Sequence, residues 1–283
     1  MITREHYSSL SKQKKVLIFG VDSQIGRNLK IFLIKNNFQV FGTTRRKENI
    51  DKNTYYVDLK QPNFDVFDME FDYVVFCAAV TGIACEEDAQ KSRLINVTGT
   101  LNAIDRLIGA KSFLIYLSSS DVFNGAKPFY KHTDKTSPLT LYGKFKNEVE
   151  EYITNKFEDK SAILRLTKVI SKETPFLARW RMEAEGKNVI KTFKNKFLSP
   201  IQISDVIESI NLLILQKENG IFQLGGHEEI SYTNYAKIFF KDSPSVLKLI
   251  SAQFDDDMKN LSVHNSLATF LPDKENQNNL NTR

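Results

Sequence analysis

Residues 16–26 read Val16-Leu17-Ile18-Phe19-Gly20-Val21-Asp22-Ser23-Gln24-Ile25-Gly26, and this stretch decides the fold expected of the chain. Four apolar residues that end at a glycine are typical of a strand covered on both faces. Apolar side chains then recur at helical spacing, at Ile25, Leu29, Phe32 and Leu33. The stretch therefore predicts a buried strand, a tight turn and the start of a helix, an arrangement that can bind the pyrophosphate of a dinucleotide.

Two glycines define this turn. Gly20 lets the chain bend sharply off the strand, and Gly26 lets the helix pack close to the sheet. Ser23 stands where a third glycine would allow the closest approach of the backbone to the pyrophosphate. Its hydroxyl therefore either weakens dinucleotide binding or contacts a phosphate oxygen. A plain strand-to-helix turn is the alternative interpretation. We assign Gly20, Ser23, Gln24, Ile25 and Gly26 to cofactor binding.

The end of the second predicted strand, 38–43, bears on the choice of cofactor. A carboxylate about 20 residues after the turn would bind the ribose hydroxyls of NAD, but the chain has Arg45 and Arg46 there. Planar guanidinium groups suit a 2′-phosphate, so we predict NADP, with NAD possible and exposed loop cations as the other interpretation. After the third strand, 53–57, Asp58 is assigned to the adenine amino group or to a surface turn, with Leu59 beside it.

A serine, a tyrosine and a lysine form the candidate catalytic set. Tyr142 and Lys146 are one of three Tyr–Lys pairs with four-residue spacing. Only this pair opens a predicted helix, 142–157, shortly after a strand that ends in the serines at 118–120. Residues four apart share one helix face, so the phenol and the ammonium should lie together near Ser119. The other two pairs are Tyr56/Lys60 and Tyr152/Lys156.

The chemistry of hydride transfer needs these groups. A free tyrosine has a pKa of about 10, and a neighbouring ammonium and an oxidised nicotinamide both favour phenolate, so we expect the pKa of Tyr142 to be lowered. Tyr142 then serves as acid or base, and Lys146 also holds the nicotinamide ribose. Ser119 hydrogen-bonds the substrate carbonyl. Together with the turn, the three residues predict a nicotinamide-dependent oxidoreductase. The alternative is that the serines at 118–120 only form a polar strand end and that Tyr142 is a half-buried packing residue.

The pattern along the rest of the chain predicts a Rossmann-type α/β fold with a doubly wound parallel sheet, because strands alternate with helices. After about residue 170 this pattern loosens. Further strands are expected at 73–78, 112–117, 161–166, 188–193 and 220–224, and helices at 87–108, 175–186 and 204–216.

Bulk composition restricts the class of protein. The chain has 283 residues, 41% of them hydrophobic, and its formal charge is +5, which fits an ordinary solvated surface and gives no support to nucleic-acid binding. Cys77 and Cys85 show no disulfide or metal-ligand spacing, so we expect no metal site and a reducing compartment. With no predicted signal peptide or membrane span, we expect a soluble, cytoplasmic protein without a membrane partner.

Over residues 15–240 the chain resembles the extended short-chain dehydrogenase/reductases, most closely the dTDP-4-dehydrorhamnose reductase branch of sugar-nucleotide-binding proteins. In this resemblance Ser120-Asp121 stands where the branch often has Asp-Tyr, and an expected Arg-Pro segment near the C-terminus is absent. The matching stretches are 20–26, 76–79, 96–100, 117–125, Pro138 with 142–146, 197–201, and 222–226 with Ser231.

The resemblance implies roles for individual residues and regions. Ser119, Tyr142 and Lys146 take the catalytic roles, Ala78 and Ala79 line the nicotinamide half of the cofactor, and Asn96 lies in the helix beside the site. The implied organisation is a flexible lead (1–14), an NAD(P)-binding domain (15–170, with 201–225 returning to it), a small substrate-binding subdomain (171–200 and 226–271) and a flexible tail (272–283).

We therefore expect an NADP-dependent reductase of a keto group on a nucleotide-activated 4-keto-6-deoxy sugar, used in polysaccharide biosynthesis. Lys191, Lys194 and Lys196 are candidates for the substrate diphosphate or for a solvated basic loop, and Trp180 for the pocket wall or the core. An epimerase or dehydratase of the same superfamily is one alternative, and a non-catalytic cofactor-binding regulatory subunit is another. In relatives the helix that carries Tyr142 is a common dimer surface, so a homodimer is possible.

Overall fold

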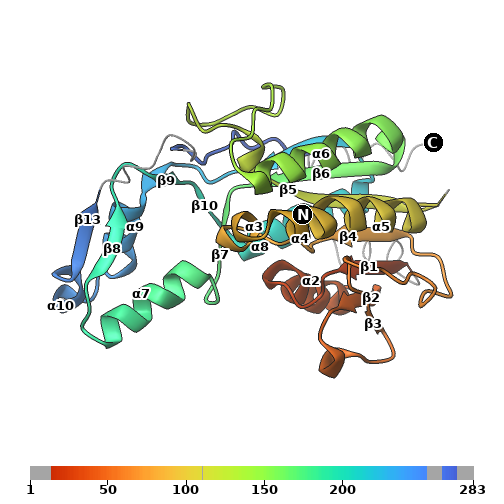
Figure 1. Cartoon of the computed structure of the whole chain (residues 1–283), viewed down its shortest axis with the longest axis horizontal. Helices are drawn as coiled ribbons and strands as arrows, with labels where there is room; N and C mark the ends of the chain where they lie inside the picture. Colours follow the sequence, from red (N-terminus) through yellow and green to blue (C-terminus); the bar gives the residue numbers. More distant parts are fainter. Residues whose placement is uncertain (1–13, 110, 254–262, 273–283) are drawn as a thin grey trace.

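The structure is a computed structural model that describes residues 14–109, 111–253 and 263–272. Apart from Lys14 and Pro272, the predicted flexible lead and tail lie outside the described residues. Two lobes of unequal size are visible in Figure 1, a larger one around a central sheet and a smaller one that contains α7, β8 and β13.

The larger lobe is built on a seven-stranded sheet with the order β11-β6-β5-β4-β1-β2-β3. Every neighbouring pair in it is parallel, which confirms the predicted doubly wound fold. The strand order reverses between β1 and β4, and ligands bind at the carboxyl edge of such a switch point. The strands are β1 (Lys15–Phe19), β2 (Gln39–Thr44), β3 (Thr54–Tyr56), β4 (Tyr73–Phe76), β5 (Phe113–Ser119), β6 (Ser161–Leu166) and β11 (Gly220–Leu224).

Helices cover both faces of this sheet. On one face α2 (Gln24–Lys35) and α8 (Ile203–Gln216) pack against the strands, and Leu33 of α2 joins Ile210 of α8 in one fully buried core. On the other face α5 (Thr100–Leu107) and α6 (Leu141–Lys156) form a second core around Val149. The strands are therefore buried on both sides, which explains the continuous apolar runs in the sequence.

The smaller lobe has a core of its own. It contains α7 (Pro175–Glu185), α9 (Tyr232–Phe239), α10 (Pro244–Leu247) and a parallel pair of β8 (Ile190–Phe193) with β13 (Ile250–Gln253). Trp180 is 1% exposed within this core, so the packing interpretation of Trp180 holds and the pocket-wall alternative is wrong. Two small ladders lie between the lobes: β7 (Lys168–Ile170) with β10 (Pro200–Gln202), and β9 (Phe197–Leu198) with β12 (Ile230–Ser231).

The helix expected over 87–108 is interrupted in the structure. It is replaced by α3 (Ile83–Glu87), α4 (Ala89–Arg93), a π-helical turn η2 (Leu94–Gly99) and α5. Asp88 leaves the helical conformation, and its side chain accepts a hydrogen bond from the Lys91 amide, which starts a new helix. Short 3₁₀ turns are η1 (Lys47–Asn49), η3 (Ser120–Val122) and η4 (Glu158–Lys160).

The described part of the chain contains neither a membrane-spanning helix nor a cluster of metal-ligating side chains. No helix there is both long and apolar enough to cross a bilayer. No group of three or more His, Cys, Asp or Glu side chains in the same residues could hold a metal ion. Cys77 and Cys85 are both free thiols.

Candidate active site

The turn after β1 has the geometry of a phosphate cradle. Gly20 has a φ of +88°, and a Cβ placed on it would lie 3.0 Å from Ala78, so a side chain there would be strained and crowded. Gly26 is closer still to its surroundings, because a Cβ on it would lie 2.5 Å from the Gly20 carbonyl oxygen. Both predicted glycines are therefore required by the local backbone.

Ser23 has a structural role at this turn. It is the N-cap of α2, and its hydroxyl accepts a hydrogen bond from the Gly26 amide at 3.0 Å. The amides of Gln24 and Ile25, in the first turn of the helix, have no intrahelical acceptor. The buried side-chain amide of Gln24 also has no partner among the described residues. The free backbone amides of the first turn fit the oxygens of a dinucleotide pyrophosphate.

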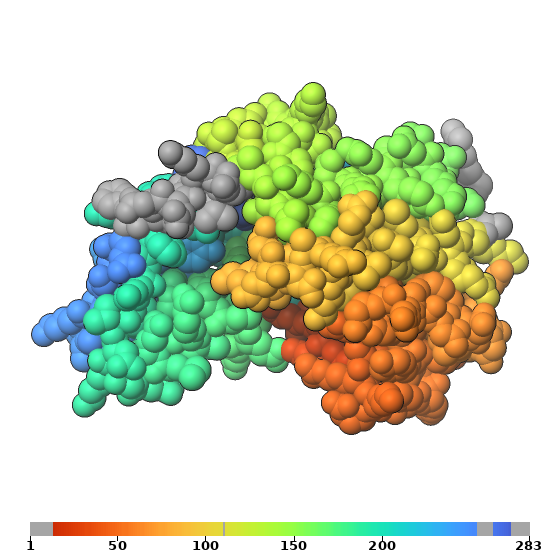
Figure 2. Space-filling model, in the orientation of Figure 1, coloured from red at the N-terminus to blue at the C-terminus, as the bar shows by residue number. Residues whose placement is uncertain are grey.

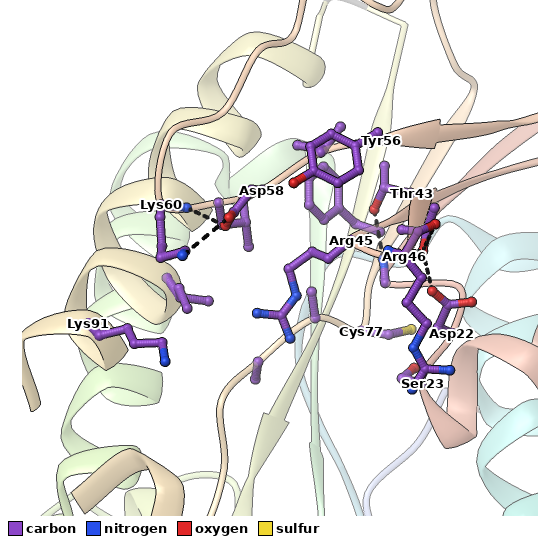
Figure 3. A pocket seen from close by; sticks show the side chains of 18 residues that line it. Asp22, Ser23, Thr43, Arg45, Arg46, Tyr56, Asp58, Lys60, Cys77 and Lys91 are labelled. Atoms are coloured by element: carbon purple, nitrogen blue, oxygen red, sulfur yellow. Dashed lines mark hydrogen bonds and ion pairs between the residues drawn. The ribbon is translucent and has the colours of Figure 1, made fainter. Parts of the chain in front are cut away.

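A cavity of about 540 Å³ opens beside this turn, at the carboxyl ends of β1, β2 and β4 (Figure 3). It brings together residues that the sequence assigned separately to cofactor binding. Of the assigned set, Gly20, Ser23, Arg45, Arg46, Asp58, Leu59, Ala78 and Ala79 line it, whereas Gln24, Ile25, Gly26, Tyr142 and Lys146 do not. The other lining residues are Phe19, Asp22, Thr43, Thr44, Tyr56, Val57, Lys60, Cys77, Lys91 and Ile95.

The two arginines are available to a ligand. Arg45 and Arg46 are exposed, and neither guanidinium forms an ion pair or a hydrogen bond with another described residue. Figure 3 shows Arg45 extending into the pocket while Arg46 runs beside the phosphate turn. Asp58 is already engaged, since its carboxylate accepts from the Lys60 amide at 3.0 Å and pairs with the Lys60 ammonium at 3.5 Å.

Asp22 also lines the pocket, although it is not among the residues assigned from the sequence. It lies in the turn itself, and its carboxylate accepts hydrogen bonds from the Thr44 hydroxyl and, at 2.8 Å, from the Asn49 side chain. Asp22 could have been singled out from the sequence, because an acidic residue in a phosphate-binding turn places negative charge where phosphates are expected.

Tyr142 and Lys146 lie together, as their spacing predicts. Both belong to α6, and the Lys146 ammonium lies 5.8 Å from the centre of the Tyr142 ring. Lys146 is 4% exposed, and its ammonium donates a 2.7 Å hydrogen bond to the Leu117 carbonyl of β5. The ammonium also lies 4.4 Å from the centre of the Tyr116 ring. These contacts fix the lysine at the carboxyl end of β5.

Residues 118–121, the serine loop, pack against the start of the same helix. A Cβ on Gly143 would lie 2.0 Å from the Asp121 carbonyl oxygen. The loop therefore contacts α6 directly at Gly143, the residue after Tyr142. Ser119 ends β5, and its hydroxyl accepts from the Asp121 amide at 3.2 Å. The buried hydroxyl of Ser118 has no partner among the described residues. The fold thus brings the predicted Ser, Tyr and Lys to one region.

The electrostatics of this region differ from the sequence expectation in one respect. Burial, followed by the charge of Asp121, raises the pKa of Tyr142, so the expectation of a lowered pKa is wrong for the protein alone. Burial lowers the pKa of Lys146 to about 8, while the nearby Glu150 opposes this change. A buried phenol keeps its proton because the phenolate would lose its hydration.

Asp121 is held by a polar network that reaches the C-terminal segment. Asn265 donates to its carboxylate at 3.1 Å and accepts from the Ser120 hydroxyl at 2.8 Å. Burial raises the pKa of the Asp121 carboxyl, whereas the positive charges of Lys168 and Lys196 lower it. The Ser120-Asp121 departure noted in the sequence is thus part of a charged cluster beside the serine loop.

The chain matches the family described as the RmlD substrate binding domain over residues 14–259. The chain belongs to this family. The match includes the phosphate turn, the serine loop and α6, and it agrees with the resemblance read from the motifs.

Named relatives of this RmlD family chain are similar over different lengths. The spore coat polysaccharide biosynthesis protein SpsK of Bacillus subtilis is 27% identical over 86% of this chain and 84% of its own. The dTDP-4-dehydrorhamnose reductase of Aggregatibacter actinomycetemcomitans is 25% identical over 81% and 79%. The methionine adenosyltransferase 2 subunit beta of Bos taurus is 31% identical, but only over 50% of this chain and 42% of its own.

Solved structures share the RmlD family fold. The dTDP-4-dehydrorhamnose reductase of Bacillus anthracis, solved in complex with NADP, superposes with a TM-score of 0.76. It is 19% identical, and the superposition covers 92% of this chain and 88% of that one. At this identity the likeness supports the fold.

Five further polar residues of this RmlD family chain complete the description: Asn96 was assigned from the resemblance, Lys191 and Lys196 were left open, and Lys168 and Asn265 were missed together with Asp22. Asn96 lies in η2, and its side-chain amide makes two 2.8 Å hydrogen bonds to the backbone of Val80, which fixes the loop after β4. Lys191 is exposed on β8, whereas Lys196 is half buried and acts on Asp121. Lys168 and Asn265 carried no sequence signal, because only tertiary folding brings them to the serine loop.

Proposed function

We propose that this chain is an NADP-dependent reductase of a keto group on a nucleotide-activated sugar. The observation that carries the proposal is the pairing of Tyr142 with a buried Lys146, 5.8 Å from its ring, at the sheet edge that also bears the dinucleotide-type pocket. An acid–base pair beside such a pocket is suited to carbonyl reduction.

The pocket residues give NADP a complementary surface. The amides at the start of α2, beside the pocket residues Gly20 and Ser23, would bind the pyrophosphate, and the two arginines would bind the 2′-phosphate. Ala78 and Ala79 would lie against the nicotinamide half, on the loop that Asn96 holds. NADPH, when bound, supplies the hydride for the reduction.

The chain's own residues would manage the proton. A raised pKa keeps Tyr142 protonated near neutrality, so it can donate its proton to the carbonyl oxygen as that oxygen gains negative charge. Ser119 would orient the carbonyl through its hydroxyl. Lys146 would hold the nicotinamide ribose, and its ammonium would favour the phenolate that remains after donation.

The sugar nucleotide is proposed to occupy the hollow between the two lobes. Figure 2 shows the surface hollowed between α7 and the phosphate turn. The positive charges of Lys168 and Lys196 lower the pKa of the Asp121 carboxyl, and neither lysine forms an ion pair among the described residues. The net positive charge suits the substrate diphosphate. The named reductase and polysaccharide-biosynthesis relatives support this substrate class.

The direct test is NADPH oxidation with a panel of nucleotide-linked sugars. dTDP- and UDP-linked 4-keto-6-deoxy sugars would be compared with the corresponding 4-hydroxy sugars. We expect NADPH consumption to match reduced product only with the keto sugars. Conversion of a sugar with no net NADPH consumption would instead indicate an epimerase or dehydratase.

A regulatory role is a second candidate because of the 31% identity to a methionine adenosyltransferase subunit over half of this chain. A regulatory subunit would form a stable complex with another enzyme and oxidise no NADPH on any sugar in the panel. The buried Lys146 beside Tyr142 favours catalysis, since desolvating an ammonium is costly without a chemical use. Dimerisation and a cytoplasmic location stay predictions.

A further inference from the structure

The phosphate turn carries a carboxylate, Asp22, that lines the same cavity as the two arginines. Asp22 follows β1, yet its side chain is bound to Thr44 at the end of β2 and to Asn49 in η1. The Thr44 hydroxyl in turn accepts from the Arg46 amide at 2.9 Å. The position of Asp22 is therefore tied to the backbone that presents the two arginines.

This position coincides with the ribose end of the pocket. In dinucleotide-binding sheets the residue that binds the ribose hydroxyls comes from the end of the second strand. Here β2 offers no carboxylate, but Asp22 lies against its last residue and lines the same cavity as Arg45 and Arg46 (Figure 3). Half-buried Asp22 is held in place by both of its side-chain hydrogen bonds.

The arginines and Asp22 have opposite effects on the binding of NADP and of NAD. A 2′-phosphate is attracted by the guanidinium groups and repelled by the carboxylate. A 2′-hydroxyl can donate a hydrogen bond to a carboxylate, whereas guanidinium groups only donate and are less suited to it. A pocket with both groups therefore has binding partners for NADP and for NAD.

We propose that Asp22 sets the cofactor selectivity of this site, by accepting a hydrogen bond from the ribose 2′-hydroxyl of NAD and opposing the 2′-phosphate of NADP. The site then accepts both dinucleotides, and the two arginines give NADP its advantage. This inference rests on the proposed function, because it assumes that the pocket binds a nicotinamide dinucleotide.

Equilibrium titration of NADPH and NADH, followed by their fluorescence, tests the inference without a sugar substrate. In Asp22→Asn we expect the ratio of the NADH Kd to the NADPH Kd to rise about tenfold, as a hydrogen bond to a charged group would give. Asp22→Ser should change the ratio in the same direction. Glu48→Gln is the matched control: Glu48 is exposed on the neighbouring η1, and its change removes one negative charge without touching this cavity.

Each outcome bears on the inference in a definite way. A rise in the ratio for both Asp22 variants, with Glu48→Gln close to wild type, supports it. An unchanged ratio, an equal loss of both cofactors, or an equal shift in Glu48→Gln overturns it, while cofactor binding by the wild type leaves the proposed function intact. Failure of the wild type to bind either dinucleotide would overturn both.

Discussion

The Lys146 ammonium lies 5.8 Å from the centre of the Tyr142 ring, and burial changes the pKa of the two groups in opposite directions. It raises the pKa of the phenol and lowers that of the ammonium to about 8. Both changes favour the neutral form, because the low-dielectric surroundings disfavour charge. The pair therefore combines a Tyr142 phenol with a raised pKa and a Lys146 ammonium with a pKa of about 8.

Replacement of Tyr142 by phenylalanine should reduce kcat by at least about 100-fold, the usual contribution of a positioned general acid. The NADPH Kd should stay close to the wild-type value, since the phenylalanine keeps the ring. Steady-state kinetics and NADPH titration measure the two effects separately.

Tyr152→Phe is the control for this change. Tyr152 forms a second Tyr–Lys pair on α6, but its hydroxyl is bound at 2.7 Å to Asp105 on the outer surface. We expect its kcat to stay within about twofold of wild type, because surface changes have small effects. Near-normal turnover by Tyr142→Phe would show that another group donates the proton.

The pH dependence should report the state of Lys146. The ammonium is protonated below its pKa of about 8 and neutral above it. If the charge assists Tyr142, kcat falls as the pH rises through this value. In Lys146→Met this limb should disappear and kcat should be lower at every pH.

Glu150 provides an independent check of that assignment. Its negative charge raises the pKa of Lys146, so Glu150→Gln should move the alkaline limb of the kcat profile to lower pH. The sign is fixed, because loss of a nearby carboxylate makes the ammonium less favourable. A limb that keeps its position in this variant would have to belong to another group.

The fold could be predicted largely from local patterns. The run 16–19, the turn glycines and the alternation of strands and helices depend on neighbouring residues, so the parallel sheet and the position of α6 could be anticipated. The interruption of the helix expected over 87–108 was missed because Asp88 acts as a cap only in the folded geometry.

The candidate site could be predicted only in part, for a different reason. Spacing along one helix was enough to pair Tyr142 with Lys146. The contacts of Asp22 join residues 22 and 27 positions apart, and that between Asp121 and Asn265 spans 144 positions. The raised pKa of Tyr142 depends on burial by surrounding elements. Local spacing contains no information about such contacts.

The N-cap of α2 predicts a stability difference between two substitutions of Ser23. Its hydroxyl accepts from the Gly26 amide, so Ser23→Ala should lower the free energy of unfolding by about 1 kcal/mol. Ser23→Gly should cost only a few tenths of a kcal/mol, roughly, since glycine is tolerated at this position. Urea unfolding of the cofactor-free protein measures both, and equal stability of the two variants would argue against the capping role.

The buried pair of Arg165 and Glu150 connects β6 to α6 beneath the candidate site. Their side chains are 3% and 5% exposed, and an Arg165 nitrogen lies 2.7 Å from a Glu150 oxygen. Arg165→Met should lower the free energy of unfolding by about 3–5 kcal/mol, because it leaves a buried carboxylate without its partner. Urea unfolding of the cofactor-free protein is the measurement.

The double variant Arg165→Met/Glu150→Leu separates the cost of an unpaired charge from the loss of packing. Since it removes both charges, it should recover most of the stability lost in Arg165→Met. The arginine also lies 3.4 Å from the Gln223 side-chain oxygen, so a small deficit should remain. A double variant as unstable as the sum of the two single changes would show that shape, and not charge pairing, makes Arg165 important at this position.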